Sequence, residues 1–272
     1  MQSPASGQID PNRLIKRGLA VSSLFDLTGK TAIVTGASHG IGQAIAVALA
    51  QAGARIAGVA RSAQDVTAKA VRAAGSDYCA IAADLASIEP VERILDETTA
   101  WAGRTDILVN NAGILRRADP LEFSEQDWDD VINVDLKSVF FLAQAFAKRA
   151  VARGGGAKII NVASILAQVG GIRVPSYTAP KHGVAGLTRL LANEWAAKGI
   201  NVNAIAPGYV RTDATQALQD DPVRSEKLLS RIPAGRWGEP EDMGGAAVFL
   251  ASRASDYCHG TLLVVDGGWL AG

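Results

Sequence analysis

Short apolar runs alternate with helical segments along most of this chain, and this alternation limits the possible folds more than any other feature. The runs are rich in Val, Ile and Ala and lie at 31–36, 55–60, 77–84, 106–113, 157–164, 200–208 and 261–268. Apolar strands separated by helices are typical of a parallel sheet covered on both faces. The sequence therefore predicts an α/β fold: one doubly wound, Rossmann-like domain with a seven-stranded parallel sheet and helices on both faces.

No linker or internal repeat divides the regular part of the chain, so we assign residues 25–272 to one domain. Residues 1–24 mix Pro, Ser and Gly with charged residues, which predicts a loosely ordered N-terminal arm. The arm has no apolar run of signal-peptide length, and no other segment approaches the length of a membrane span. We therefore expect a soluble, cytoplasmic protein without a membrane partner.

The charges and the potential metal ligands exclude several classes of function. Lys and Arg together number 27, as do Asp and Glu, so nothing indicates a nucleic-acid partner. The only two cysteines, Cys79 and Cys258, are far apart, and the three histidines do not have ligand spacing. We therefore expect neither a disulfide framework nor a bound metal.

A glycine-rich turn, "TGASHGIG" at 35–42, joins the first apolar run to the first helical segment. Gly36, Gly40 and Gly42 allow a tight turn and a close approach of the backbone to a ligand. The helix that follows would offer free N–H groups and its positive dipole end to a phosphate. Tight turns need glycine in any case, but this position between strand and helix favours a dinucleotide site.

The other candidate functional residues also lie at or just after the ends of predicted strands. In a doubly wound sheet the ligand lies beyond the carboxyl ends of the strands. The residues expected at that edge are 35–42, 60–62, Asp84, 110–113, Ser164, Pro207 and Gly208. This agreement favours a functional interpretation of the nearby "SYTAPKHG", in which Tyr177 and Lys181 stand four residues apart.

Together these segments resemble the short-chain dehydrogenase/reductase family. "TGASHGIG", "NNAG", Ser164, "YTAPK" and "APG" have the family's order and spacing, and the resemblance covers about residues 25–272. Longer segments such as "GGIRVPSYTAPKHG" and "RIPAGRWGEP" resemble the branch of 2-deoxy-D-gluconate 3-dehydrogenases and gluconate 5-dehydrogenases. The resemblance implies a nicotinamide-dependent oxidoreductase that interconverts a hydroxyl and a ketone on a sugar acid.

Tyr177 is the acid–base group that the resemblance implies, with Lys181 and Ser164 beside it. A free phenol titrates near pH 10, and a lysine ammonium one helical turn away would favour the phenolate near neutrality. Lys181 would also bind the nicotinamide ribose, and the Ser164 hydroxyl would donate to the substrate oxygen. The alternative is an amphipathic tyrosine and a solvated lysine on a helix surface. We expect the helix to start near Ser176, with Pro180 in its first turn, where proline is tolerated.

The fourth catalytic residue departs from the family pattern. The family has an asparagine in the long helix before Ser164, where it holds a water in a proton relay to the lysine. In "NVDLKSVF" the matching position is Asp135, a carboxylate that can only accept hydrogen bonds when ionised. We assign Asp135 to the catalytic group, while Asn133 remains the structural alternative.

The residue at the end of the second predicted strand discriminates between the two nicotinamide cofactors. Family members that use NAD carry an Asp or Glu there, but this chain has Ala60 followed by Arg61 and Ser62. A guanidinium can pair with the 2′-phosphate of NADP, so we favour NADP, while NAD remains possible. The resemblance assigns the cofactor to Gly36, Ser38, His39, Gly40, Ile41, Arg61, Ser62, Asp84, Leu85, Asn111, Ala112, Gly113, Tyr177, Lys181, Pro207, Gly208, Val210 and Thr212.

A sugar-acid carboxylate requires a cation in the pocket. Arg173, between Ser164 and Tyr177, is our first candidate, and Arg117 is the second. The polar segment from about 213 to 231 would form a mobile lid, and the family resemblance implies a homotetramer. Two alternatives remain: a 3-oxoacyl carrier-protein reductase, and a non-catalytic NADP-binding subunit.

Overall fold

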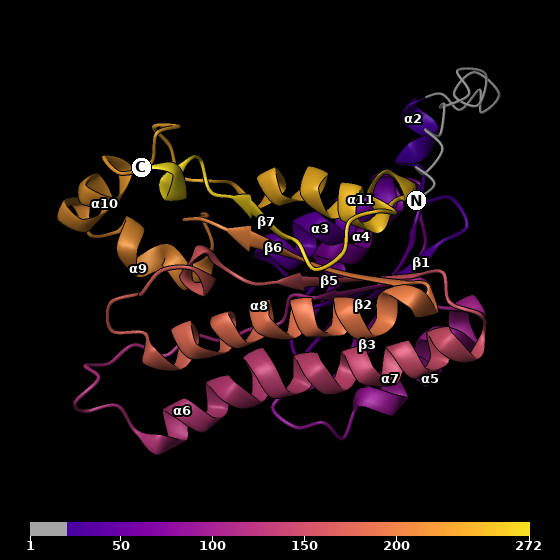
Figure 1. The fold of residues 1–272 in the computed structure, drawn as a ribbon. Coiled ribbons are helices and arrows are strands. Elements are labelled where there is room, and N and C mark those ends of the chain that lie inside the picture. The colour runs from indigo at the N-terminus through magenta and orange to yellow at the C-terminus, as the bar shows by residue number, and fades with distance from the viewer. Residues whose placement is uncertain (1–20) are drawn as a thin grey trace, which may run out of the picture.

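The computed structural model describes residues 21–272, which form one seven-stranded sheet with helices on both faces (Figure 1). All neighbouring strands are parallel, in the order β3-β2-β1-β4-β5-β6-β7. The strands are β1 Thr31–Thr35, β2 Arg55–Ala60, β3 Tyr78–Ala82, β4 Ile107–Asn110, β5 Ala157–Val162, β6 Ile200–Pro207 and β7 Leu262–Val265. The predicted fold class is confirmed. The expected arm lies outside the described residues, except for the short helix α2, Val21–Leu24.

The helices form two layers around this sheet. One face carries α3 (Gly40–Gln51), α4 (Asp65–Ala73) and α11 (Gly244–Ala251). The other carries α5 (Val91–Ala102), α7 (Ser138–Ala152) and α8 (Pro175–Trp195). The short helices α9 (Gln216–Gln219) and α10 (Pro222–Leu229) lie beyond the end of β6 (Figure 1). No helix of the described chain is both long enough and apolar enough to span a membrane.

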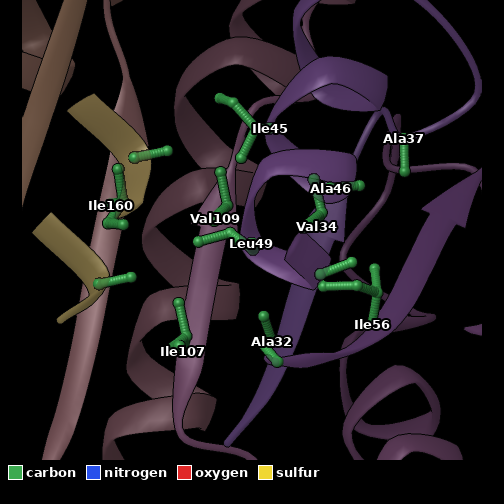
Figure 2. Packing of buried hydrophobic residues seen from close by; sticks show 14 of the residues in the cluster. Ala32, Val34, Ala37, Ile45, Ala46, Leu49, Ile56, Ile107, Val109 and Ile160 are labelled. Atoms are coloured by element: carbon green, nitrogen blue, oxygen red, sulfur yellow. The ribbon is translucent and has the colours of Figure 1, made fainter. Parts of the chain in front are cut away.

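The core is split between the two faces of the sheet because successive strand residues point in opposite directions. In β1, Ala32 and Val34 pack against the layer of α3, whereas Ile33 packs against the layer of α5 and α7. Figure 2 shows Ile45 and Leu49 of α3 lying over Val34 and Val109. Since β1 is buried on both faces, its carboxyl end is held rigidly and positions the glycine-rich turn.

The long helix expected at about 124–153 contains an irregularity. It consists of α6 (Glu125–Ile132), a π-helical segment (Asn133–Lys137) and α7. Ser124 caps its start by accepting a hydrogen bond from the Asp127 amide at 3.1 Å. Single π turns inside α-helices are frequent at functional sites, and this one carries Asp135.

Helix α8 starts at Pro175, one residue before the expected position. The expectation for Pro180 was wrong: it lies inside the helix, beyond the first turn. A proline there has no N–H to donate to the carbonyl of Ser176, so one backbone hydrogen bond of the helix is missing. The interruption falls between Tyr177 and Lys181.

Gly58 in β2 marks a close approach between the sheet and a buried tyrosine. A Cβ on Gly58 would lie 1.8 Å from the hydroxyl oxygen of Tyr78. That hydroxyl donates to Oε1 of Gln64 at 2.5 Å, and burial raises the pKa of Tyr78 well above its ordinary value. Only glycine leaves room for this hydrogen bond at position 58.

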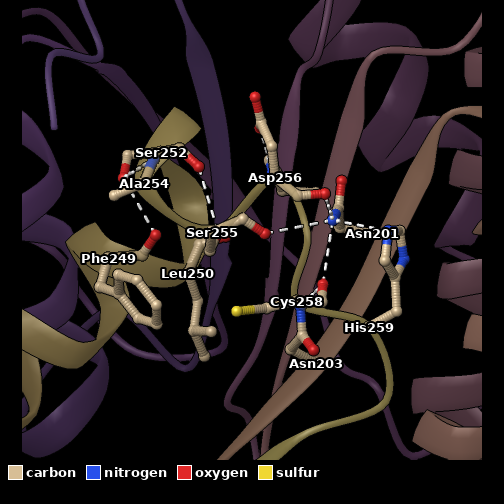
Figure 3. Close-up of polar contacts among 11 residues, drawn as sticks. Asn201, Asn203, Phe249, Leu250, Ser252, Ala254, Ser255, Asp256, Cys258 and His259 are labelled. Carbon is tan, nitrogen blue, oxygen red and sulfur yellow. Dashed lines mark hydrogen bonds and ion pairs between the residues drawn. The ribbon is translucent and has the colours of Figure 1, made fainter. Parts of the chain in front are cut away.

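Two asparagines of β6 hold the loop that leads into β7 (Figure 3). Nδ2 of Asn201 donates to the carbonyl oxygens of Asp256 and Cys258, each at 3.0 Å. Nδ2 of Asn203 donates to the Cys258 carbonyl at 2.9 Å, and its Oδ1 accepts from the Thr261 amide at 3.0 Å. These bonds fix the approach to β7 and therefore the C-terminal segment that follows it.

Candidate active site

The glycine-rich turn between β1 and α3 is packed tightly against the loop after β4. A Cβ on Gly42 would lie 2.2 Å from the carbonyl oxygen of Gly36, and one on Gly36 would lie 2.7 Å from Nδ2 of Asn111. Gly36 and Gly40 both have positive φ, 66° and 57°. In the described chain the N-cap residue of α3, His39, makes no side-chain cap hydrogen bond. The turn therefore presents a helix N-terminus in a cradle that side chains would fill, and it fits a pyrophosphate.

Thr35 and Asn111 join the two loops. Oγ1 of Thr35 accepts hydrogen bonds from the amides of Asn111 and Ala112, each at 2.9 Å. Nδ2 of Asn111 donates to the carbonyl oxygen of Thr35 at 2.8 Å. Ala112 and Gly113 continue from this junction toward Asp135. The predicted cofactor residues of the two loops therefore form one connected edge.

Three of the four predicted catalytic residues lie on two neighbouring elements. Ser164 follows β5 at the start of the turn Ile165–Ala167, and its Oγ accepts from the Leu166 amide at 3.1 Å. That turn packs against α8, which carries Tyr177 and Lys181. Nζ of Lys181 lies 5.1 Å from the centre of the Tyr177 ring and donates to the carbonyl oxygen of Val162 at 3.1 Å.

Asp135 lies beside Lys181. Nζ of Lys181 is 3.3 Å from Oδ2 of Asp135, and both side chains are almost completely buried. Oδ1 accepts from the Ile114 amide at 2.8 Å, while Oδ2 makes no regular hydrogen bond with any residue of 21–272. A Cβ on Gly113 would lie 2.9 Å from Oδ2, so this glycine makes room for the carboxylate.

Burial and charge act in opposite directions on this pair. Burial raises the pKa of the Asp135 carboxyl, and the nearby Lys181 ammonium offsets only part of that effect. Burial by itself would lower the pKa of Lys181, but the negative charges available on Tyr177 and Asp135 outweigh it and raise the pKa. Lys181 is therefore held as an ammonium between the two oxygen acids.

Arg61 and Asp84, at the ends of β2 and β3, form a loose ion pair. Their Nη1 and Oδ2 atoms are 3.8 Å apart, and the side chains are 64% and 56% exposed. His39 is similarly exposed and lies 3.6 Å from Asp213. Arg61 therefore has donors available for another anion, whereas Leu85 is buried.

The two predicted substrate arginines differ in their relation to Tyr177. Burial lowers the pKa of Arg117, and the Tyr177 phenol is among the groups that raise it in turn. Arg173 is exposed and has a positive φ of 62°, which is uncommon for a residue other than glycine. Arg117 thus lies within electrostatic reach of Tyr177, the predicted acid–base group.

Sequence reasoning missed a buried chain of hydrogen-bonded polar side chains. Nδ2 of Asn110 donates to Oδ1 of Asn161, and Nδ2 of Asn161 donates to Oγ1 of Thr188, each at 2.9 Å. The chain connects β4, β5 and α8. Polar residues at the ends of predicted strands were the available signal, but the sequence does not show which of them face each other.

The family model described as enoyl-(acyl carrier protein) reductase matches residues 36–270. The chain belongs to the short-chain dehydrogenase/reductase family. The 2-dehydro-3-deoxy-D-gluconate 5-dehydrogenase of Escherichia coli K12 is 56% identical over 92% of this chain and 99% of its own length. These matches confirm the family resemblance predicted from the motifs.

Solved structures of family members have the same fold. A protein of Agrobacterium tumefaciens with bound NADP is 57% identical, covers 92% of this chain and 99% of its own, and superposes with a TM-score of 0.87. A gluconate 5-dehydrogenase of Burkholderia cenocepacia, in complex with NADP and tartrate, is 40% identical over 93% of this chain and all of its own, with a TM-score of 0.88.

Proposed function

We propose that this protein is an NADP-dependent dehydrogenase that interconverts a hydroxyl and a ketone on a hexonate-type sugar acid. The observation that carries the proposal is the buried Lys181, whose Nζ lies between the Tyr177 ring and the Asp135 carboxylate. Relatives named for gluconate and 2-dehydro-3-deoxy-D-gluconate dehydrogenation support the substrate class.

The residues present fit a nicotinamide dinucleotide. The glycine turn at the start of α3 would hold the pyrophosphate, Arg61 and Ser62 the 2′-phosphate, and Lys181 the nicotinamide ribose. Val210 and Thr212 follow the sharp turn at Pro207 and Gly208 and would border the nicotinamide. The cofactor supplies or accepts the hydride at its nicotinamide ring.

Tyr177 and Ser164 act on the substrate oxygen. In the reducing direction the Tyr177 hydroxyl gives its proton to the ketone oxygen as the carbon accepts hydride, and Ser164 donates a hydrogen bond to the developing alkoxide. In the oxidising direction the Tyr177 phenolate takes the proton from the alcohol. Lys181 stabilises the phenolate in both directions, because it remains an ammonium throughout.

Asp135 has a positioning role in this proposal. Its carboxylate holds the Lys181 ammonium at 3.3 Å, and its Oδ1 fixes the Ile114 amide next to the predicted cofactor residues. In this chain the asparagine of the family pattern is replaced by a carboxylate, which adds a negative charge next to the lysine.

An assay of purified protein tests the proposal. 2-Dehydro-3-deoxy-D-gluconate, D-gluconate and 2-deoxy-D-gluconate are offered with NADP⁺ and NAD⁺ separately, and the reduced cofactor is followed by absorbance. We expect turnover of at least one sugar acid and a higher kcat/KM with NADP⁺. Turnover of 3-oxoacyl carrier-protein substrates with NADPH but of no sugar acid would contradict the proposal.

The assembly and location predicted from the sequence also belong to this proposal. We expect a homotetramer, since the family resemblance implies one, and a cytoplasmic location. Light scattering of the purified protein tests the first, and fractionation of the source cells tests the second.

A further inference from the structure

Asp135 is a buried acid with one oxygen atom that the fold leaves largely unused. The side chain is fully buried, and its Oδ1 accepts a hydrogen bond from the Ile114 amide at 2.8 Å. Oδ2 lies 3.3 Å from Nζ of Lys181 and makes no regular hydrogen bond within residues 21–272. A buried polar atom of this kind is rare in a folded protein and calls for an explanation.

Lys181 is the charged group that faces this carboxyl. The π-helical segment that carries Asp135 packs against α6, α7 and α8, and every other charged residue of these four elements is exposed or half-buried. The same Nζ of Lys181 lies 5.1 Å from the centre of the Tyr177 ring. Tyr177 and Asp135 are thus two oxygen acids beside one buried ammonium.

The Asp135 carboxyl becomes negative as the pH rises, whereas the asparagine of the family pattern stays neutral. Burial raises the pKa of Asp135, and the Lys181 ammonium offsets only part of this effect. Once ionised, the carboxylate lies 3.3 Å from the ammonium, where opposite charges interact strongly in a buried site. The positive charge of Lys181 is then no longer available to Tyr177 alone.

We propose that Asp135 competes with Tyr177 for the positive charge of Lys181, so that Tyr177 keeps its proton to a higher pH than it would beside an asparagine. This inference rests on the proposed function, in which Tyr177 moves the substrate proton. A phenolate beside an unpaired ammonium makes a neutral pair, whereas a phenolate beside the Lys181–Asp135 ion pair leaves one net negative charge. In a buried site that extra charge is costly and favours the protonated phenol.

The competition affects the pH range in which each direction of the reaction is fast. The protonated Tyr177 hydroxyl is the form that reduces a ketone, and the phenolate is the form that oxidises an alcohol. Near neutral pH, Asp135 thus keeps Tyr177 in the form needed for reduction, and oxidation accelerates as the pH rises further. The equilibrium constant of the reaction is unchanged, because Asp135 is not consumed.

Alkaline titration of the protein without cofactor or substrate tests the competition. Ionisation of Tyr177 is followed by ultraviolet absorbance, as the difference between each protein and its own Tyr177→Phe derivative. We expect the phenolate to appear at least about one pH unit lower in Asp135→Asn than in the unmodified protein. Asparagine keeps an oxygen for the Ile114 amide, and the smaller, neutral Asp135→Ser should shift the ionisation in the same direction.

Asp106→Asn is the matched control. Asp106 is also a buried acid, 2% exposed, which pairs with Arg104 and accepts from the Thr31 amide at 3.1 Å. It precedes β4 and therefore lies at the opposite end of that strand from the loop that carries Asn111. This variant should ionise Tyr177 at the pH of the unmodified protein.

The sugar-acid assay provides a second readout. With NADP⁺, Asp135→Asn should move the pH dependence of kcat/KM for oxidation to lower pH, in the direction of the absorbance change, and Asp106→Asn should leave it in place. An unchanged ionisation of Tyr177 in Asp135→Asn would overturn the inference, as would an equal shift in Asp106→Asn. Either result would leave the proposed function intact, because the titration uses neither sugar acid nor cofactor.

Discussion

Nζ of Lys181 lies 3.3 Å from Oδ2 of Asp135, and both side chains are almost fully buried. The pair connects α8 with the π-helical segment. Gly183 of α8 lets the two elements approach closely, because a Cβ on this residue would lie 2.9 Å from Cδ1 of Leu136. A buried ion pair stabilises a fold less than its distance suggests, because both ions lose hydration. We therefore infer that the main role of this ion pair is to fix the Lys181 ammonium beside Tyr177.

The Asp135→Asn variant tests how this pair responds to pH. Burial raises the pKa of Asp135 in the folded protein, so folding favours its protonated carboxyl. The contribution of this group to the free energy of unfolding is therefore complete below the pKa of the unfolded chain, about 3.9. That contribution is lost as the pH rises through the folded-state pKa. We expect the free energy of unfolding of the unmodified protein, relative to Asp135→Asn, to fall between pH 4 and pH 8. Urea unfolding of both proteins across this range measures it.

Asparagine does not titrate, so the comparison cancels the pH dependence of groups unaffected by the change. A difference that is constant or rises with pH would show that Asp135 is stabilised as a carboxylate in the folded protein.

Arg61→Gln tests the choice of cofactor. The Arg61 guanidinium is mostly exposed and only loosely paired with Asp84, so it can bind a 2′-phosphate without breaking a strong contact. We expect kcat/KM for NADP⁺ to fall at least about tenfold, while that for NAD⁺ changes little. Arg253→Gln is the control, because Arg253 is exposed in the loop after α11. Equal losses with both cofactors would exclude a 2′-phosphate contact.

Gly58→Ala tests the tight contact in β2. The new methyl group would overlap the Tyr78 hydroxyl, which must then move and break its bond to Gln64. We expect a loss of about 1–3 kcal/mol in the free energy of unfolding, as for other overpacked cores. Chemical denaturation provides the measurement.

Gly245→Ala is the matched substitution in α11. A Cβ at Gly245 meets no atom within 4 Å, and alanine favours a helix over glycine by about 1 kcal/mol. This variant should be as stable as the unmodified protein or slightly more so. If both variants lost a similar amount of free energy of unfolding, overlap with the Tyr78 hydroxyl would not be the cause of the loss in Gly58→Ala.

The sequence was sufficient for those features that local pattern determines. The seven strands followed from apolar runs between helical segments, and the direction of parallel strands brings the glycine-rich turn and the loop after β4 to one edge of the sheet. Asp135 and Lys181 could be assigned from motif spacing, and the structure brings them to 3.3 Å. Their mutual burial depends on the packing of α8 against the π-helical segment, which no local pattern reveals.

Features that depend on long-range packing could not be predicted. Pro180 was expected in the first turn of its helix, because proline is tolerated there, but the helix starts at Pro175, so Pro180 is its sixth residue and lies beyond that turn. Arg173 was preferred to Arg117 because its loop lies between Ser164 and Tyr177, and this preference stays a prediction. The hydrogen-bonded chain of Asn110, Asn161 and Thr188 joins β4, β5 and α8, so spacing in the sequence carried no signal for it.

The rate of sugar-acid oxidation by Tyr177→Phe, with NADP⁺ near neutral pH, tests the central claim most directly. Phenylalanine keeps the ring beside Lys181 but removes the hydroxyl that moves the proton. We predict that kcat falls by about 10²–10⁴-fold, the usual contribution of a general acid or base, while the affinity for NADPH stays within a few-fold. A Tyr177→Phe protein that oxidises the sugar acid at the rate of the unmodified protein would contradict the account.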